Sequence, residues 1–579
     1  MSINPLLEEL KKLRESSKYA VAQGNAYHLD EFKKYLHIER HIEVVLKNII
    51  IKASSNSISQ LIIVAGNVGD GKSHILSHLH HELNNELEKF LIHNDATESH
   101  NPHESSNTTL YKLLGGFKDV NIHTSTDKII LAINLGTLSK FIEEYGDEFS
   151  LLRGYVNDNK ILDTELLPDD ESVLTSNFHH VNFTDYHMYS LTDKGVISDV
   201  ISTLLKKIVS DDKANTIYQA YQDYKEHNHD VYYCPIVYNY EFLFSQNNRN
   251  ILIQLIVKAI IRSKEIVSVR TLLNFIYDII VPVDLSNAKE YYFKKLEKMT
   301  GAEYLSNLIP NYLFEHKELS SLFEKIETID PCSYRHAKTD EILLTLINAE
   351  ETLDIFSEFI DESYLVTIKP KLLKTSTPKI QLAKFFIRLN YFSNYHTMDY
   401  LADTDFDEYV MWLFQYNNNN RKCIQKLYKL VEESARNWYG DPKTSEKVIL
   451  NVGKKQTLFR VFKDFKVHPE VNFALEKNNS KIERFTQEFT LQFKLDNGKK
   501  PVKIHVDYSL FKVLKMVSKG YRPNKKDNNN YVYFVSTINK LINQNNSTAS
   551  LYIDEVNVKN AIDYKFSKDA FSGYKFHIV

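Results

Sequence analysis

A glycine-rich turn between an apolar run and an amphipathic segment constrains this chain more than any other feature. The stretch LIIVAGNVGDGKSHILSHLHHEL covers residues 61–83, and three of the 16 glycines of the chain fall within six positions of it. The β-branched run before the turn predicts a buried strand, and the spacing of apolar residues after it predicts a helix. A glycine turn that joins a strand to a helix is the setting of a phosphate-binding loop.

The turn GNVGDGKS contains the complete phosphate-binding pattern, with Gly66, four residues, and then Gly71, Lys72 and Ser73. Backbone N–H groups can wrap a polyanion closely where residues without a Cβ atom adopt unusual φ and ψ angles. The helix beginning near Lys72 directs unpaired N–H groups and a partial positive charge towards the same anion. The residues predicted to bind ATP and Mg²⁺ are Gly66, Asn67, Val68, Gly69, Asp70, Gly71, Lys72, Ser73 and His74.

Hydrolysis of a bound nucleotide needs groups beyond those of the loop. Lys72 would reach the β- and γ-phosphates, and the Ser73 hydroxyl would coordinate Mg²⁺. Asp95 ends the apolar run KFLIHND and is the predicted metal-binding carboxylate, while Glu98 is a second candidate for polarising water. Asp95 follows Lys72 closely along the chain, so it could instead cap the loop after its strand.

Polar residues at the ends of other predicted elements could complete this site. Asn134 ends the apolar run IILAIN, where its amide could act as the sensor of an AAA+ ATPase or simply turn the chain. Arg270 begins an apolar helix and is the candidate for stabilising phosphate charge. Neighbouring copies in a homo-oligomer often supply a second arginine. Asn182 and Asp185, in VNFTDY, could serve the same site or cap a turn, and we favour the cap.

The order of predicted elements defines the fold class and the domains. Strands that alternate with helices over residues 61–190 predict an α/β P-loop NTPase core of AAA+-like type, with a parallel sheet. A helical segment at 1–60 precedes it, and helical periodicity predicts a lid-like region at 191–290 and a helical domain at 291–440. Strand-like segments and a hairpin at LDNGKK predict a basic α+β domain at 441–579.

Several individual elements are also predicted. Residues 30–55 and 249–284 are each expected to form one continuous helical stretch, and a shorter helix is expected near 108–115. Strands are expected at 89–99, 127–138, 179–191 and 530–536. The histidine pairs at 80–81 and 179–180 are expected on helix or strand surfaces, without a metal.

Composition bounds the class of protein. The chain is 43% hydrophobic and 25% charged, which is typical of globular proteins. It lacks a run of eighteen apolar residues, and its start, MSINPLLEELKKLRESS, indicates an amphipathic helix rather than a signal peptide, so we expect a cytoplasmic protein without a membrane partner. Cys234, Cys332 and Cys423 lie far apart, without CxxC or Cys/His spacing, and predict neither a zinc site nor a disulfide framework.

Charge is distributed unevenly along the chain. Residues 441–579 contain 25 Lys and Arg against 14 Asp and Glu, whereas residues 1–440 contain 46 against 61. A basic tail region is compatible with nucleic acid, with an acidic partner, or with an ordinary solvated surface. Interleaved cations and tyrosines could follow a DNA backbone, and a solvated helix and loop would have the same composition. The residues concerned are Lys512, Lys515, Lys519, Arg522, Lys525, Lys526, Tyr508, Tyr521 and Tyr531.

The segments GNVGDGKSH, HNDATES, AINLGTL and GYRPN, in this order and in a chain of this length, resemble the DptF family, also called DndF. Its members are the P-loop ATPase components of bacterial DNA phosphorothioation-dependent restriction systems. The resemblance spans most of the chain and is most specific through the loop and the sheet. It implies that Gly66, Gly69, Gly71, Lys72 and Ser73 bind ATP and Mg²⁺, with Asp95 and Asn134 carried over by position.

The resemblance also implies partners and a biological role. A DptF-like protein would act with sibling DptG and DptH subunits to restrict invading DNA that lacks the protective sulfur modification. Contact with DNA could be direct or through the complex. Two alternatives stay open, namely a nucleotide-gated scaffold with little turnover and a signalling NTPase unrelated to DNA.

Overall fold

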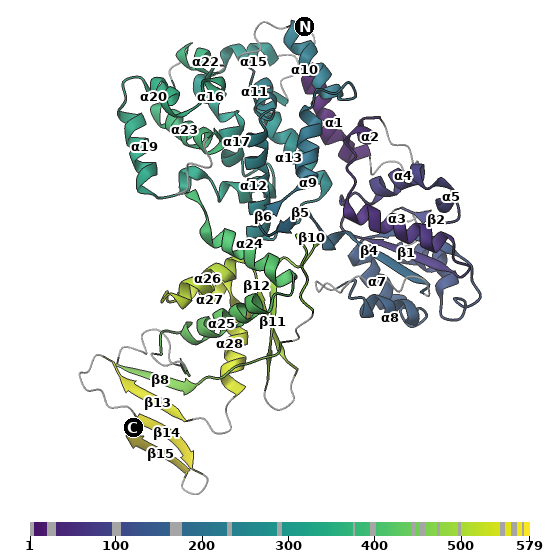
Figure 1. Cartoon of the computed structure of the whole chain (residues 1–579), viewed down its shortest axis with the longest axis vertical. Helices are drawn as coiled ribbons and strands as arrows, with labels where there is room; N and C mark the ends of the chain where they lie inside the picture. The colour runs from purple at the N-terminus through teal and green to yellow at the C-terminus, as the bar shows by residue number, and fades with distance from the viewer. Residues whose placement is uncertain are drawn as a thin grey trace. The chain divides into compact units, whose positions relative to one another are not determined.

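The contacts within a computed structural model divide the chain into two units (Figure 1). Unit 1 contains Met1–Ser190, Val196–Ala402 and Glu483–Phe485, and unit 2 contains Leu191–Gly195, Asp403–Ile482 and Thr486–Val579. The structure describes residues 5–19, 31–94, 106–162, 176–227, 234–286, 292–366, 368–374, 377–393, 401–442, 446–450, 458–471, 475–495, 500–544, 550–556, 564–569 and 573–578.

A four-stranded parallel sheet forms the centre of the α/β part of unit 1, in the order β2-β3-β1-β4. Its strands are β1 (Gln60–Ala65), β2 (Leu91–His93), β3 (Lys128–Ile133) and β4 (Phe178–Asn182). β1 pairs with β3 through Ala65↔Ile133 and with β4 through Ala65↔Asn182. Because every pair is parallel, the C-terminal ends of the strands, including the start of the glycine turn, lie at one edge of the sheet.

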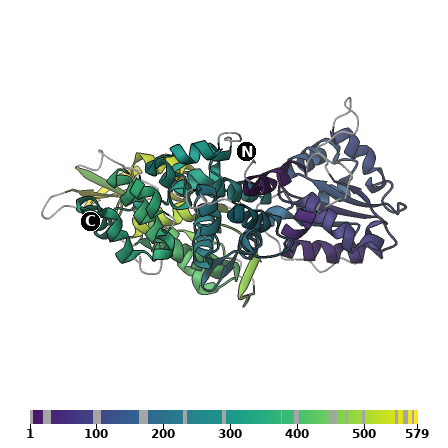
Figure 2. The same ribbon diagram turned by 90° about the horizontal axis from the view of Figure 1, so that it is seen from above.

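Both faces of this sheet are covered by helices (Figure 2). Leu61, Ile63 and Ala65 pack against residues of α6, α7 and α8, whereas Ile62 and Val64 pack against α3 and α4. This alternation follows from the two-residue period of a strand, and all five side chains are fully buried. The helices are α3 (His41–Ser54), α4 (Lys72–Glu82), α5 (Asn84–Leu87), α6 (Ser106–Leu113), α7 (Leu135–Tyr145) and α8 (Ser150–Asp158).

Helices make up most of the remainder of unit 1. α1 (Pro5–Tyr19) buries Leu6, Leu10 and Leu13 and packs against α10 and α13. Among the described helices, none has the length and apolar composition needed to cross a membrane. The bounds are α2 (Glu31–Leu36), α9 (Asp199–Val209), α10 (Thr216–His227), α11 (Pro235–Phe242), α12 (Gln246–Ser263), α13 (Val269–Ile280), α14 (Val283–Ser286), α15 (Tyr292–Lys298), α16 (Gly301–Ser306), α17 (Ile309–Glu315), α18 (Ser321–Glu327), α19 (Ala337–Asn348), α20 (Thr352–Phe359), α21 (Glu362–Leu365), α22 (Lys369–Lys374) and α23 (Lys379–Ser393).

Two predicted strands have the wrong extent. The strand expected at 127–138 ends at Ile133, because Asn134 caps α7 by accepting a hydrogen bond from the Thr137 N–H. The single strand expected at 179–191 is wrong, since the chain there forms β4, a 3₁₀ turn at Phe183–Asp185, and β5 (Tyr186–Thr192). Of the strand expected at 89–99, the described part contains only β2.

Two predicted helical stretches are interrupted. The described part of 30–55 forms α2 and α3 rather than one helix, because Lys207 Nζ donates hydrogen bonds to the carbonyls of Tyr35 and His37, at 2.7 and 2.6 Å. Residues 249–284 break after α12 at Lys264, whose left-handed φ of 54° ends that helix. The helix expected near 108–115 is confirmed by α6.

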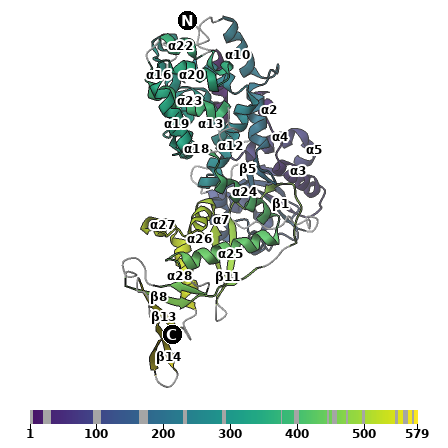
Figure 3. The same ribbon diagram turned by 60° about the vertical axis from the view of Figure 1, so that its left-hand side comes forward.

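Unit 2 contains five helices and two antiparallel sheets among its described residues. Apart from Leu191–Gly195, the residues of this unit begin at Asp403, so α24 and α25 belong to it. Figure 3 shows α25 beside α26. The helices are α24 (Thr404–Asn417), α25 (Arg421–Asn437), α26 (Tyr508–Ser518), α27 (Lys525–Asn530) and α28 (Val532–Gln544).

The strands of unit 2 agree with the sequence in most places. β11 and β12 pair as the predicted hairpin, through Phe493↔Val502. The strand expected at 530–536 is wrong, because most of that segment belongs to α28, which buries Phe534 against Trp438. The strands of the two sheets are β7 (Lys447–Ile449), β8 (Phe459–Asp464), β9 (His468–Pro469), β11 (Phe489–Lys494), β12 (Val502–Val506), β13 (Leu551–Glu555), β14 (Tyr564–Asp569) and β15 (Gly573–Ile578).

Asp278 gives unit 1 a testable pH dependence. Its carboxyl group is buried on α13, and burial raises its pKa to about 6, with Arg14 at 3.5 Å opposing that shift. Between about pH 4 and pH 6 the folded chain therefore binds more protons here than the unfolded chain, so this group lowers the free energy of unfolding as pH rises. Over this pH range, the free energy of unfolding of Asp278→Asn should rise by about 1–3 kcal/mol relative to that of wild type.

Urea unfolding at several pH values measures this difference. The control is Asp147→Asn, which removes an aspartate whose side chain is 98% exposed and should leave the pH dependence as in wild type. Parallel pH profiles for Asp278→Asn and wild type would contradict the prediction.

Candidate nucleotide site

The turn after β1 has the backbone shape that its glycines permit. Gly69 and Gly71 adopt left-handed φ angles of 89° and 94°, which residues with a Cβ atom rarely adopt. At Gly66 the constraint is packing, because a Cβ atom there would lie 2.7 Å from Phe183 Cβ. The glycines are therefore required by conformation at two positions and by close approach at the third.

Lys72 folds back across this loop. Its ammonium group donates hydrogen bonds to the carbonyls of Gly66 and Asn67, at 2.9 and 2.6 Å. The N–H of Asn67 donates to Asp70 Oδ2 at 2.6 Å, which closes the loop from inside. Burial raises the pKa of Asp70, and the Asn67 hydrogen bond and the charges of Lys72 and Arg40 oppose that shift. The loop is thus preformed, with a cation at its centre.

The helix after the loop begins without a side-chain cap. Gly71 is the N-cap residue of α4, and it has no side chain that could accept from the first N–H groups. Other helices of unit 1 begin with an oxygen-bearing side chain that accepts such a bond, at Asn134, Ser198, Ser245 and Ser268. The start of α4 therefore offers main-chain donors and a positive dipole end to an anion. The residues present fit a nucleotide phosphate with its magnesium ion, for which Ser73 supplies a hydroxyl.

Arg40, the N-cap residue of α3, supports the loop, and the sequence interpretation missed it. Its guanidinium donates to the carbonyl of Asp70 at 3.2 Å and lies over the ring of Phe183, with its central carbon 5.6 Å from the ring centroid. Burial lowers the pKa of Arg40, against the opposing charges of Asp70 and Glu43. A single arginine 30 residues before its contact has no local pattern that could have revealed it.

The start of α13 touches the loop from another direction. The N–H of Arg270 lies 3.5 Å from the Gly69 carbonyl oxygen. A Cβ atom on Gly69 would lie 3.0 Å from Ser268 Oγ and 3.3 Å from Arg270 Cβ. The structure therefore brings Arg270, chosen as the phosphate-binding arginine, to the glycine loop, while its role towards a phosphate stays a prediction.

The other predicted catalytic residues have different positions. Asn134 follows β3 next to the loop, since the Gly66 N–H donates to the Ile133 carbonyl at 3.2 Å. Its side chain caps α7, which is the alternative considered for this residue, and the sensor role stays a prediction. Asp95 and Glu98 lie outside the described residues. The strand before them, β2, is separated from β1 by β3, so it is not the immediate neighbour of the loop strand.

His74 and the remaining candidates make contacts of other kinds. The His74 ring nitrogen Nε2 lies 3.0 Å from His37 Nδ1, and burial lowers the pKa of His74 to about 4. Asn182 caps the 3₁₀ turn, as interpreted from the sequence, and Asp185 pairs with Arg484 at 3.2 Å. His179 is buried, contrary to the surface position expected, with Nε2 2.8 Å from Gln60 Oε1.

The basic stretch of unit 2 uses several of its side chains internally. Tyr508 is buried and donates to Asp403 at 3.0 Å, and Tyr531 donates to the Ser509 carbonyl at 3.3 Å. Lys515 pairs with carboxylates on α24, and Tyr521 donates to a carboxylate on α27. These residues therefore stabilise unit 2, and DNA contact by the remaining cations stays a prediction.

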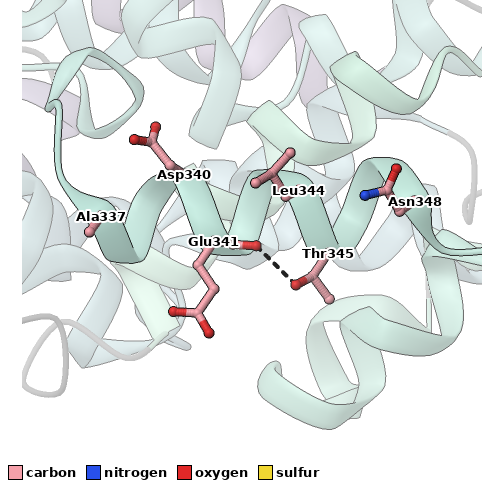
Figure 4. A pocket seen from close by; sticks show the side chains of 6 residues that line it. All are labelled: Ala337, Asp340, Glu341, Leu344, Thr345 and Asn348. Atoms are coloured by element: carbon pink, nitrogen blue, oxygen red, sulfur yellow. Dashed lines mark hydrogen bonds between the residues drawn. The ribbon is translucent and has the colours of Figure 1, made fainter.

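A hollow beside α19 in unit 1 does not form a second candidate site. Figure 4 shows residues of α19 that line it, with the Thr345 hydroxyl donating to the Glu341 carbonyl at 2.9 Å. Since all the lining residues belong to one helix, the hollow brings together no groups from separate elements.

Comparison with known proteins adds no identification. Neither a family model, nor a curated protein, nor a solved structure matches the chain.

Replacement of Gly66 tests the packing at the loop. In Gly66→Ala the new Cβ atom would press on Phe183 Cβ, which is fixed to the backbone, so the fold should lose about 1–3 kcal/mol of unfolding free energy. The control is Gly154→Ala on α8, where an added Cβ meets no atom within 4 Å and should stabilise the helix by about 0.5–1 kcal/mol. Urea unfolding measures the free energy of unfolding of both variants. Equal values for Gly66→Ala and wild type would contradict the prediction.

Proposed function

We propose that this chain binds ATP with Mg²⁺ at residues 66–74 and hydrolyses it. The observation that carries the proposal is a glycine loop held in its turn conformation, with Lys72 across it and an uncapped helix start beyond it. Main-chain donors, a helix dipole and one ammonium group then act on the same anion. Bound Mg²⁺ would supply charge neutralisation at the phosphates, with Ser73 as its protein ligand.

The side chains of the loop have distinct roles in this proposal. Lys72 needs only to move its ammonium group from the loop carbonyls towards a phosphate oxygen, because it already lies within the turn. Asp70 holds the turn through the Asn67 N–H and leaves the later N–H groups for the ligand. Asp95 is the proposed carboxylate for the metal and Asn134 the proposed sensor, while Glu98 is a second candidate for orienting water.

The contact between Gly69 and the start of α13 suggests how the nucleotide state would reach the rest of unit 1. A phosphate in the loop would act on backbone that touches Ser268 and Arg270. A change in the γ-phosphate would then shift α13, whose apolar face is buried among neighbouring helices. Arg270 is the proposed charge-stabilising arginine in this arrangement.

We further propose that the turnover serves DNA restriction, as the resemblance to the DptF family suggests. In this proposal the chain works in the cytoplasm with DptG- and DptH-like subunits against DNA that lacks phosphorothioate groups. The support is the order of the four quoted segments and the length of the chain. The alternative is a scaffold that is held in its assembly by ATP and turns it over slowly.

Lys72→Ala tests the nucleotide site. Loss of a charged hydrogen-bond donor should weaken ATP binding by about 10–100-fold, and phosphate release should fall with it. Isothermal titration calorimetry and a phosphate-release assay measure the two effects on the full chain. Lys140→Ala, which removes an exposed lysine on α7, is the matched control and should behave as wild type. Turnover that survives Lys72→Ala would remove the proposed enzyme activity from this loop.

Asp95→Ala separates hydrolysis from binding. If Asp95 serves the metal and the attacking water, the variant should retain ATP binding and lose about a hundredfold or more in turnover. Assays with and without DNA and the sibling subunits test the restriction role, which predicts stimulation by them. Tight ATP binding without turnover in wild type would instead indicate the scaffold, and turnover indifferent to DNA and subunits would indicate a signalling NTPase.

A further inference from the structure

Three side chains converge beside α4, on elements separated in the sequence. His37 lies in the interruption between α2 and α3, Glu43 is in the first turn of α3, and His78 is on α4. Glu43 Oε1 lies 3.3 Å from His37 Nε2 and 3.0 Å from His78 Nδ1. One ligand atom from each side chain falls within 4.8 Å of the others.

These atoms are shielded from water and are not satisfied by the protein. Glu43 is 3% exposed, and the His37 side chain is 10% exposed. Within the described part of the chain, His37 Nε2, His78 Nδ1 and Glu43 Oε2 are buried and make no hydrogen bond of acceptable geometry. Since buried polar atoms are nearly always hydrogen-bonded, three neighbouring atoms that lack a hydrogen bond indicate a missing partner.

The surrounding contacts fix the orientation of His37. Its other ring nitrogen, Nδ1, lies 3.0 Å from His74 Nε2, and its carbonyl accepts a hydrogen bond from Lys207 at 2.6 Å. In the tautomer in which His37 Nδ1 donates to His74 Nε2, His37 Nε2 keeps a lone pair on the side of Glu43. Hydrogen bonds of this kind orient the imidazoles that bind metals in proteins.

We propose that His37, Glu43 and His78 form a binding site for a divalent transition metal of the Zn²⁺ type. Two imidazole nitrogens and one carboxylate are a common protein ligand set for zinc, with a fourth position for water. Ligand atoms about 2 Å from a tetrahedral zinc ion lie roughly 3.3 Å apart, close to the distances that Glu43 makes with both histidines.

The two imidazole rings of the site are stacked. The His37 and His78 rings lie face to face, with centroids 3.6 Å apart and 16° between their planes. Neutral imidazole is the form that binds a metal. A proton shared with Glu43 is the competing explanation, and it predicts no metal affinity.

This site differs from the proposed magnesium position in the nucleotide loop. Mg²⁺ prefers oxygen ligands in an octahedral arrangement, whereas imidazoles favour zinc and its neighbours in the transition series. The two sites share α4, since this helix begins at Lys72 and carries His78 further along. A metal here would cross-link α4 to α3, independently of whether the loop binds ATP.

Metal titration of the full chain tests the site directly. After treatment with a chelator, wild type should bind one Co²⁺, with visible d–d absorption, and Zn²⁺ should displace it while Mg²⁺ should not. His78→Gln and Glu43→Gln should each weaken Zn²⁺ binding at least tenfold. His81→Gln, on the exposed face of α4, is the matched control and should leave the affinity unchanged.

X-ray absorption spectroscopy of the zinc-loaded wild type provides a measurement that needs no variant. Two imidazole ligands with additional oxygen ligands support the site, even if a substitution within it unfolds the chain. Failure of wild type to bind Co²⁺ or Zn²⁺, or unchanged affinity in folded His78→Gln, would overturn the proposal. Neither result bears on ATP binding, which the Lys72→Ala measurement decides.

Discussion

Parallel pairing on both sides of β1 is the constraint on which the rest of the candidate site depends. All six residues of β1 are buried and the strand pairs with β3 and β4 on its two sides, so the segment that follows Ala65 has no free place in the sheet beside β1. The chain must then reverse and cover one face of the sheet with α4. A reversal this tight next to Phe183 leaves no room for a Cβ atom at Gly66. The geometry that suits a phosphate is therefore also a condition of folding.

The spacing of apolar residues and glycines along the chain predicted those elements of the fold that depend on neighbouring residues. The parallel sheet is confirmed, and a strand, glycine turn and helix lie where the alternation of apolar residues placed them. The AAA+-like assignment and the domain boundaries at 60, 190, 290 and 440 stay predictions. The errors have distant causes. Lys207 donates hydrogen bonds to carbonyls in the interruption between α2 and α3. In α28, where aromatic residues had suggested a strand, Phe534 packs against Trp438.

The candidate nucleotide site likewise has residues that a local motif identifies and residues that only distant contacts bring to it. The glycine motif identifies its own residues, because a phosphate requires them at fixed spacing within one loop. Arg40, Ser268 and Arg270 contact that loop from remote segments, and no spacing rule connects them to it. Arg270 was singled out through its place at the start of an apolar helix, whereas Arg40 was missed. His37, Glu43 and His78 were missed for the same reason, since only folding brings the interruption before α3 to the side of α4.

The dependence of the loop on remote segments has a consequence for dissecting the chain. The stretch from residue 61 to residue 190 includes every residue of the glycine motif and all of the parallel sheet except Gln60. Excised by itself, it would lack the guanidinium that bonds Asp70 and the serine that lies against Gly69. It would also lack α3, and a hydrophobic face of the sheet would be laid open to solvent. The smallest autonomous piece of this protein is therefore larger than the segment that its motif delimits.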